Sequence, residues 1–231
     1  MNDKANTYKP GFYTAILTTA LTTITFGIAI CTTPISGPFC KGSCIEYPFI
    51  NVISRFPRDY IWMYPAMMLT LLVVFLMVCI HYYSPVEKKV FSLTALGFTL
   101  ISSTLLFVDY FIQVSVIQPS LLRGETEGIA LLTQYNPHGI FIALEEAGYL
   151  ALAAAYLFIA FVFTGANSLE RAIRWILIIG FILAFGSFIL LSLIYGNNLE
   201  SRFEVTVITI DWLVLIIFGF LLSQVFIKRK L

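Results

Sequence analysis

Four acidic side chains stand inside long apolar stretches of this sequence: Asp109, Glu145, Glu146 and Asp211. Ionisable residues within a membrane-spanning helix are costly, usually face the protein interior and are candidates for function. No Lys or Arg lies at the centre of the same stretches. These acids are therefore expected to hold a proton, a metal or organic cation, or a network of hydrogen bonds among neutral acids.

Three of the acids are predicted to lie at a similar depth. Asp211 and Glu145 each follow the expected outer end of their helix by seven residues, and Asp109 precedes Val116 by seven, if its helix runs on that far towards Pro119. At 1.5 Å per residue, each lies roughly 10 Å beneath the outer boundary. We therefore expect Asp109, Glu145 and Asp211 to face one cavity, roofed by the loop 113–138.

Helical spacing separates the two adjacent glutamates. Residues seven or four apart share a helix face, so His138, Glu145 and Tyr149 are predicted to lie on one side. Glu146 points roughly 100° away, which favours Glu145 as the functional residue.

The other helices add polar groups near the acids. Ser102 and Asp109 are seven apart, with Gln113 one turn further along. The candidate ligand or proton-binding residues are Asp109, Glu145, Asp211, His138, Tyr149, Gln113 and Ser102. The structural alternative is that each acid satisfies a polar neighbour and fixes the helix bundle, with no ligand.

The apolar composition of the chain indicates that membrane-spanning helices position these residues. The chain has 231 residues, of which 59% are hydrophobic and 12% charged, whereas soluble domains carry roughly 25% charged residues. The mean hydropathy is +0.89. A membrane-spanning helix needs about 20 apolar residues. Six windows qualify, which predicts an all-α integral membrane protein with one domain, 1–231, and helices over 12–31, 61–83, 90–112, 139–164, 175–195 and 205–227.

Positive charge predicts the orientation, because cytoplasmic loops carry an excess of Lys and Arg. One side holds nine of the 14 basic residues and the other five. Both termini are therefore expected in the cytoplasm, with the larger loops 32–60 and 113–138 outside. The predicted location is the cell membrane, and the stretch from Lys4 to Cys31 is expected to be an anchor helix and not a cleaved signal.

Cysteine positions agree with an exposed first loop. Cys40 and Cys44 are the simplest disulfide pair there, and Cys31 is an alternative partner for either. Three residues separate Cys40 from Cys44, whereas thiol oxidoreductases use Cys-x-x-Cys, so a structural clip is favoured over redox catalysis. No histidine lies nearby, which disfavours a zinc site.

Function is less constrained by the sequence than fold. No nucleotide-binding, metalloprotease or serine-hydrolase motif appears, and no cofactor is indicated. The net charge of +1 and the lack of nucleic-acid motifs argue against nucleic-acid partners. The expected partners are the lipid bilayer and a small cation or amphiphile; the oligomeric state is left open. The leading hypothesis is an outward-facing acidic cavity that binds or transports a cation, a proton or a polar-headed amphiphile. One alternative is a membrane enzyme that uses acid–base carboxylates on a lipid; another is an assembly subunit of a membrane complex.

Overall fold

The computed structural model describes residues 3–32 and 34–228, and within them the ordered elements are all helical. Eight α-helices follow in chain order: α1 Asp3–Ile30, α2 Met63–Tyr83, α3 Lys89–Ile112, α4 Gln118–Leu122, α5 Ile129–Leu132, α6 Ile140–Ala160, α7 Ser168–Tyr195 and α8 Ser201–Lys228. Short 3₁₀ segments occupy Gly37–Phe39, Ile50–Arg55, Arg58–Tyr60, Val86–Lys88 and Gly196–Asn198, and a π-helical turn spans Gln113–Ile117.

Six of these helical segments are long and apolar enough to cross a membrane. The sequence prediction of six long apolar helices is therefore confirmed. Several bounds differ from the prediction: α1 begins at Asp3 instead of residue 12, α6 ends at Ala160 instead of 164, and α8 begins at Ser201 instead of 205. The third and fifth segments differ as well. The third segment continues past Ile112 through the π turn and α4, because Pro119 stands in the first turn of α4, where its missing N–H is not needed. The first ten residues of the predicted loop 113–138 are thus helical.

The fifth long helix begins seven residues before the predicted Trp175. The side chain of Asn167 accepts a hydrogen bond from the backbone N–H of Glu170 and caps the first turn of α7. Arg171 and Arg174 lie in these early turns. The apolar window omitted this charged part of the helix, which is stabilised by its cap and does not depend on hydropathy.

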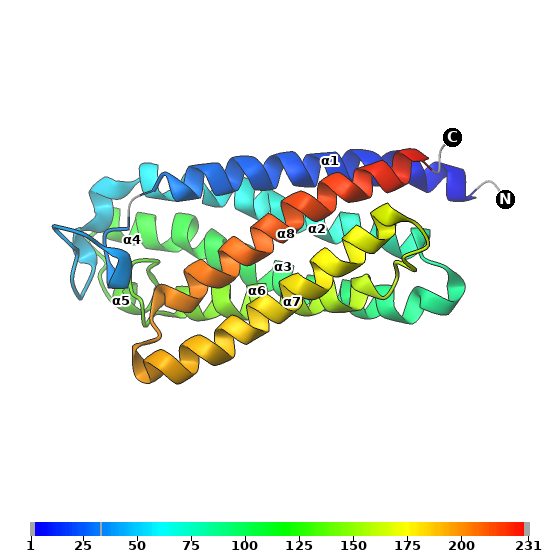
Figure 1. Cartoon of the computed structure of the whole chain (residues 1–231). Coiled ribbons are helices and arrows are strands. Elements are labelled where there is room, and N and C mark those ends of the chain that lie inside the picture. The colour runs from blue at the N-terminus through cyan, green and yellow to red at the C-terminus, as the bar shows by residue number, and fades with distance from the viewer. Residues whose placement is uncertain (1–2, 33, 229–231) are drawn as a thin grey trace.

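The long helices form a closed ring. Extensive contacts join α1 to α2, α2 to α3, α3 to α6, α6 to α7, α7 to α8 and α8 back to α1, and α8 also contacts α6. The start of α1 and the end of α8 lie at the same end of the bundle (Figure 1). We call this the terminal end, and we call the opposite end, formed by 31–32, 34–62, 123–139 and 196–200, the loop end.

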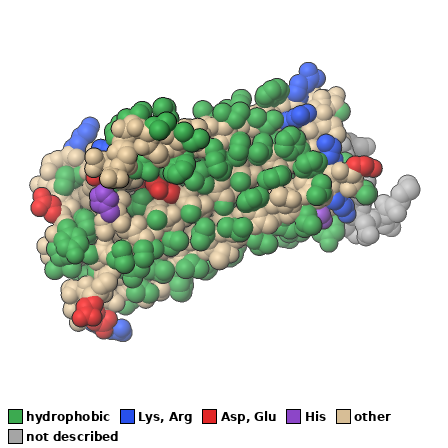
Figure 2. All heavy atoms as spheres, turned by 90° about the horizontal axis from the view of Figure 1, so that it is seen from below, with side chains coloured by type: hydrophobic (Ala, Val, Ile, Leu, Met, Phe, Trp, Pro, Cys, Tyr) green, Lys and Arg blue, Asp and Glu red, His purple; other side chains and the backbone are tan. Residues whose placement is uncertain are grey.

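Charged groups follow this division. The face seen in Figure 2 is largely apolar along the bundle, and most of its Lys, Arg, Asp and Glu side chains gather at the two ends. At the loop end, Cys40 and Cys44 form a disulfide, as predicted, while Cys31 and Cys79 are free. The disulfide closes a short turn at the loop end.

The helices α1 and α8 pack closely together at Gly219. A Cβ atom placed there would lie 2.5 Å from Thr19 Oγ1 and 3.0 Å from the carbonyl oxygen of Ala15. The hydroxyl of Thr19 also donates a hydrogen bond across the interface to the carbonyl of Ile216, at 3.4 Å. Small residues allow this kind of close helix packing in a membrane. From this crossing the two helices diverge towards the loop end (Figure 1).

Candidate functional site

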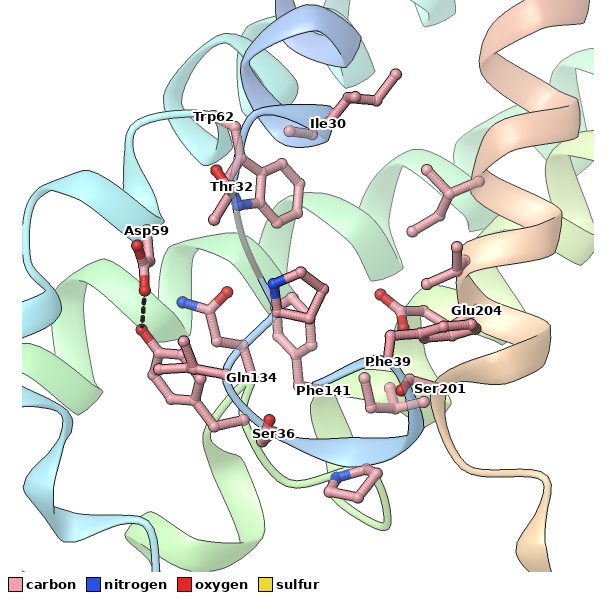
Figure 3. Close-up of a pocket in the computed structure, with 18 of the residues that line it drawn as sticks. Ile30, Thr32, Ser36, Phe39, Asp59, Trp62, Gln134, Phe141, Ser201 and Glu204 are labelled. Atoms are coloured by element: carbon pink, nitrogen blue, oxygen red, sulfur yellow. Dashed lines mark hydrogen bonds between the residues drawn. The ribbon is translucent and has the colours of Figure 1, made fainter. Parts of the chain in front are cut away.

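A cavity of about 420 Å³ lies at the loop end, where α1 and α8 have diverged. Residues of α1, α6 and α8, with Asp59 and Trp62 just before α2, form its walls, and the segments 34–39 and 134–137 contribute its loop-end lining. Figure 3 shows side chains from these separate segments around one space. The volume lies within the usual range of small-molecule sites, roughly 300–1,000 Å³.

Two tryptophans contribute aromatic surface to the cavity. Trp62 immediately precedes α2 and Trp212 belongs to α8, and their ring centroids are 6.3 Å apart. Phe26 of α1 packs edge-on against Trp212 at 5.5 Å. Trp62 and Trp212 also contact the buried rings of Tyr110 and Tyr149, respectively. This aromatic layer therefore joins the cavity to the core of the bundle.

Glu204 supplies the acidic group on the α8 wall. It stands in the first turn of α8, is half-buried and points its carboxylate towards the space (Figure 3). The basic side chains His138 and Arg202 instead pair with Glu200, at 3.9 and 2.8 Å. Across the described part of the chain, no recorded ion pair includes Glu204.

Asp59 lines the opposite wall, and its charge is already engaged. Arg58 Nε donates to Asp59 Oδ1 at 2.7 Å, and the hydroxyl of Tyr135 donates to Oδ2 at 3.3 Å. Burial raises the pKa of Tyr135, with further contributions from repulsion by Tyr60 and Asp59. The phenol is therefore protonated at neutral pH and able to donate this hydrogen bond. Asp59 serves mainly to join the start of α2 to the loop before α6.

A chain of polar groups leads from Glu204 into the bundle. The carboxyl groups of Glu204 and Glu145 are close enough to interact electrostatically. Tyr110 donates its hydroxyl hydrogen to Glu145 Oε1 at 2.7 Å, and the hydroxyls of Tyr110 and Tyr149 are 2.9 Å apart. Since Tyr110 has one hydrogen to donate, Tyr149 must be the donor to Tyr110.

Glu145 and Glu204 place two carboxyl groups near each other. Glu145 is fully buried, and its Oε2 has no hydrogen-bond partner among the described residues. Two carboxylates are acceptors only, so a hydrogen bond between them requires one to be protonated. A single proton shared by the pair would satisfy both groups.

The remaining predicted acids occupy different surroundings. Asp109 is 1% exposed and interacts electrostatically with Glu145 and Glu204, and its Oδ2 has no hydrogen-bond partner. Asp211 is fully buried, and neither of its carboxylate oxygens has a hydrogen-bond partner among the described residues. It interacts electrostatically with Tyr149 and Tyr156. The structure thus brings Asp109 and Glu145 together and places Asp211 deeper. The residues that line the cavity include none of these three.

Two other predicted polar residues have structural contacts. Gln113 donates through Nε2 to the carbonyl of Leu132 at 2.7 Å and accepts from the backbone N–H of Gln134 at 3.0 Å. Both ends of its amide therefore hold the loop 132–134 against the π turn. His138 is exposed at the molecular surface beside Glu200.

Ser102 lies away from the main cavity. It is buried and lines a void of about 20 Å³, which is also bordered by Tyr149 and Trp212. The void is of the order of a single water molecule and offers no room for a larger ligand.

Sequence reasoning missed Glu204 as a site residue. A signal was present, because Glu204 precedes Asp211 by seven residues and must share its helix face. Its position at the boundary of the apolar window made it look like a solvated helix end. Asp59 carried no comparable signal, because it follows Arg58 in a proline-containing loop and resembles a surface residue.

The acidic side chains of the bundle do not form a metal centre within the described residues. In residues 3–32 and 34–228, no group of three or more His, Cys, Asp or Glu side chains is placed to hold a metal ion. The chain matches no protein-family model, no curated protein and no solved structure at a significant level.

Proposed function

We propose that this chain is a multi-pass protein of the cell membrane whose loop-end cavity binds the head group of an organic cation from the outer side. The observation that carries the proposal is the carboxylate of Glu204, which stands without a basic partner on the wall of a cavity bordered by Trp62 and Trp212. The two tryptophans offer aromatic surface, and Glu204 offers the charge.

An organic ammonium ion suits these groups better than a hydrated metal ion. Aromatic rings attract cations through their negative faces, by about 0.5–2 kcal/mol depending on desolvation. A methylated ammonium carries its charge on a weakly hydrated surface that can contact a ring and a carboxylate together. Glu204 would form the ion pair while Trp62 and Trp212 cover the methyl groups.

The geometry supports binding more directly than transport. The polar chain runs inward from Glu204 through Glu145 and the tyrosines to the level of Asp211. Beyond it towards the terminal end, α8 presents the buried apolar residues Leu215 and Phe218. The cavity would therefore hold its ligand in the outer half of the bundle.

The proposal is tested by removing the charge of Glu204. In Glu204→Gln, the amide keeps the size of the side chain and can donate a hydrogen bond, but it cannot pair with a cation. We expect tetramethylammonium to bind at least about tenfold more weakly, which corresponds to about 1.4 kcal/mol. Isothermal titration on the protein in lipid nanodiscs measures this. Glu127→Gln, at an exposed glutamate of the same end, is the matched control. Equal affinity in the two variants would refute a role for Glu204, and no binding to the wild type would refute the proposal itself.

The orientation requires a separate test. In a Cys31→Ser background, which removes the exposed free thiol of the loop end, we expect a cysteine introduced at Glu127 to react with an impermeant maleimide on intact cells, because the basic residues concentrate at the terminal end. A cysteine at Glu87, between α2 and α3, should react only after the cells are opened. Labelling of the second position on intact cells would reverse the assignment.

One observation favours an acid–base enzyme as the second candidate. Glu145 and Glu204 form a carboxyl pair, and Glu204 also borders the cavity, so a proton could pass between them during a reaction on a bound lipid. Chemical conversion of a membrane lipid by the wild type but not by Glu145→Gln would support this function over simple binding.

A further inference from the structure

We infer that the ligand of this cavity is a single-chain cationic amphiphile, whose aliphatic chain leaves the cavity sideways between α1 and α8 into the bilayer. The inference rests on the proposed function, since it places the cationic head group at Glu204. It adds the class of the ligand and its route of entry, which the head-group site alone does not define.

The side opening follows from the crossing of α1 and α8. The two helices touch at Gly219 and diverge towards the loop end (Figure 1). Between them, Ile30 and Val205 line the cavity and are nevertheless 66% and 43% exposed on the molecular surface. A residue that borders the cavity and is also exposed on the outer surface marks a place where the cavity reaches the side of the bundle.

The opening lies at the loop-end limit of two membrane-spanning candidates. Ile30 ends one of the membrane-spanning candidates, and Val205 lies in the first turns of another. In Figure 3, Ile30 and Glu204 stand on opposite sides of the same space, on α1 and α8. A head group held at Glu204 would therefore leave its chain next to apolar helix surfaces and the outer leaflet. A freely water-soluble cation would not need this lateral gap.

The charge of the cavity lining favours a cationic amphiphile over an anionic or zwitterionic one. Among the described residues that line the cavity, the charged ones are Asp59 and Glu204, and none is basic. Arg58, beside the cavity, directs its guanidinium to Asp59. A phosphate group would meet a carboxylate without a compensating cation, which disfavours phospholipids. An alkylamine or alkyltrimethylammonium head carries the complementary charge alone.

The experiment compares a head group with and without its chain. Tetramethylammonium and octyltrimethylammonium, the latter below its micellar concentration, are titrated onto the protein in nanodiscs, with empty nanodiscs as the partition blank. Ala29→Trp and Thr209→Trp narrow the gap from the α1 side and the α8 side. Ala147→Trp, at an exposed position of α6, is the control for a large residue on the outer surface of the bundle.

Ala29 and Thr209 both line the cavity, so we expect each gap variant to weaken the binding of both probes. The loss of affinity should be at least about tenfold larger for octyltrimethylammonium than for tetramethylammonium. The use of two variants on different helices guards against a folding defect in one. Tight binding of tetramethylammonium with equal effects of the gap variants on both probes would overturn the side exit and leave the head-group site standing. Failure of both probes to bind the wild type would overturn the proposed function and this inference together.

Discussion

Binding of tetramethylammonium should release close to one proton and should strengthen about tenfold for each unit of rising pH over the range where the shared proton is lost. We expect the Glu145–Glu204 pair to hold one proton when no cation is bound, because Glu145 is fully buried and its Oε2 has no hydrogen-bond donor among the described residues. A cation beside Glu204 stabilises two ionised carboxylates and so expels this proton. The affinity for the cation therefore rises with pH, because at low pH protons compete with the cation for the carboxylates.

Calorimetry in buffers of different ionisation enthalpy measures the number of protons released. The decisive variant is Glu145→Gln, whose amide can donate a hydrogen bond to Glu204 in place of the proton. We expect it to bind the cation with little dependence on pH. The other titratable groups around the pair are Asp109, Tyr110, Glu146 and Tyr149, with Asp59 and Tyr135 across the cavity.

Asp109→Asn serves as the matched control, because Asp109 interacts with the pair electrostatically but makes no hydrogen bond to it. It should retain proton release. The same pH slope in Glu145→Gln as in the wild type would show that the shared proton lies elsewhere, and proton release abolished only by Asp109→Asn would assign it to that residue.

Replacing Gly219 by Leu should destabilise the bundle by about 1–3 kcal/mol or more, because the added side chain has no room at the crossing of α1 and α8. Its Cβ would overlap Thr19 Oγ1 at 2.5 Å and crowd the backbone of Ala15 at 3.0 Å. The hydrogen bond from Thr19 to Ile216 would also be lost. The backbone contact cannot be relieved by rotating a side chain, so the helices must separate.

Unfolding in mixed micelles with increasing denaturing detergent measures this loss. Gly97→Leu is the control, since a Cβ at Gly97 in α3 meets no other atom within 4 Å. It should be neutral or slightly stabilising, because leucine has the higher helix propensity. Equal stability of Gly219→Leu and Gly97→Leu would show that the close approach of α1 and α8 does not hold the bundle together.

The sequence determined the six long helices because apolar length is a local property. Each window of about 20 apolar residues has one favourable state in a bilayer, a helix whose backbone groups bond to one another. Details with local causes outside hydropathy were missed, such as the early start of α7 at its Asn167 cap. The disulfide between Cys40 and Cys44 was likewise predictable from a separation of four residues.

Burial of the acids was also foreseeable, because an acid inside an apolar helix is driven towards other helices and away from lipid. Asp109, Glu145 and Asp211 are indeed buried. Their partners were not foreseeable. The contact of Glu145 with Tyr110 joins residues 35 apart in the chain, and the spacing along one helix carries no information about which face of another helix it meets.

Only the tertiary structure decided where the cavity lies and which carboxylate reaches it. The space exists because α1 and α8 meet at Gly219 and diverge towards the loop end, so its walls come from segments as distant as Phe26 and Trp212. Counting residues from the expected helix ends placed three acids at one depth in the membrane. Depth, however, fixes only one coordinate of each side chain. The rotation and tilt of each helix in the closed ring supplied the others, and they put Glu204 at the cavity with Glu145 behind it.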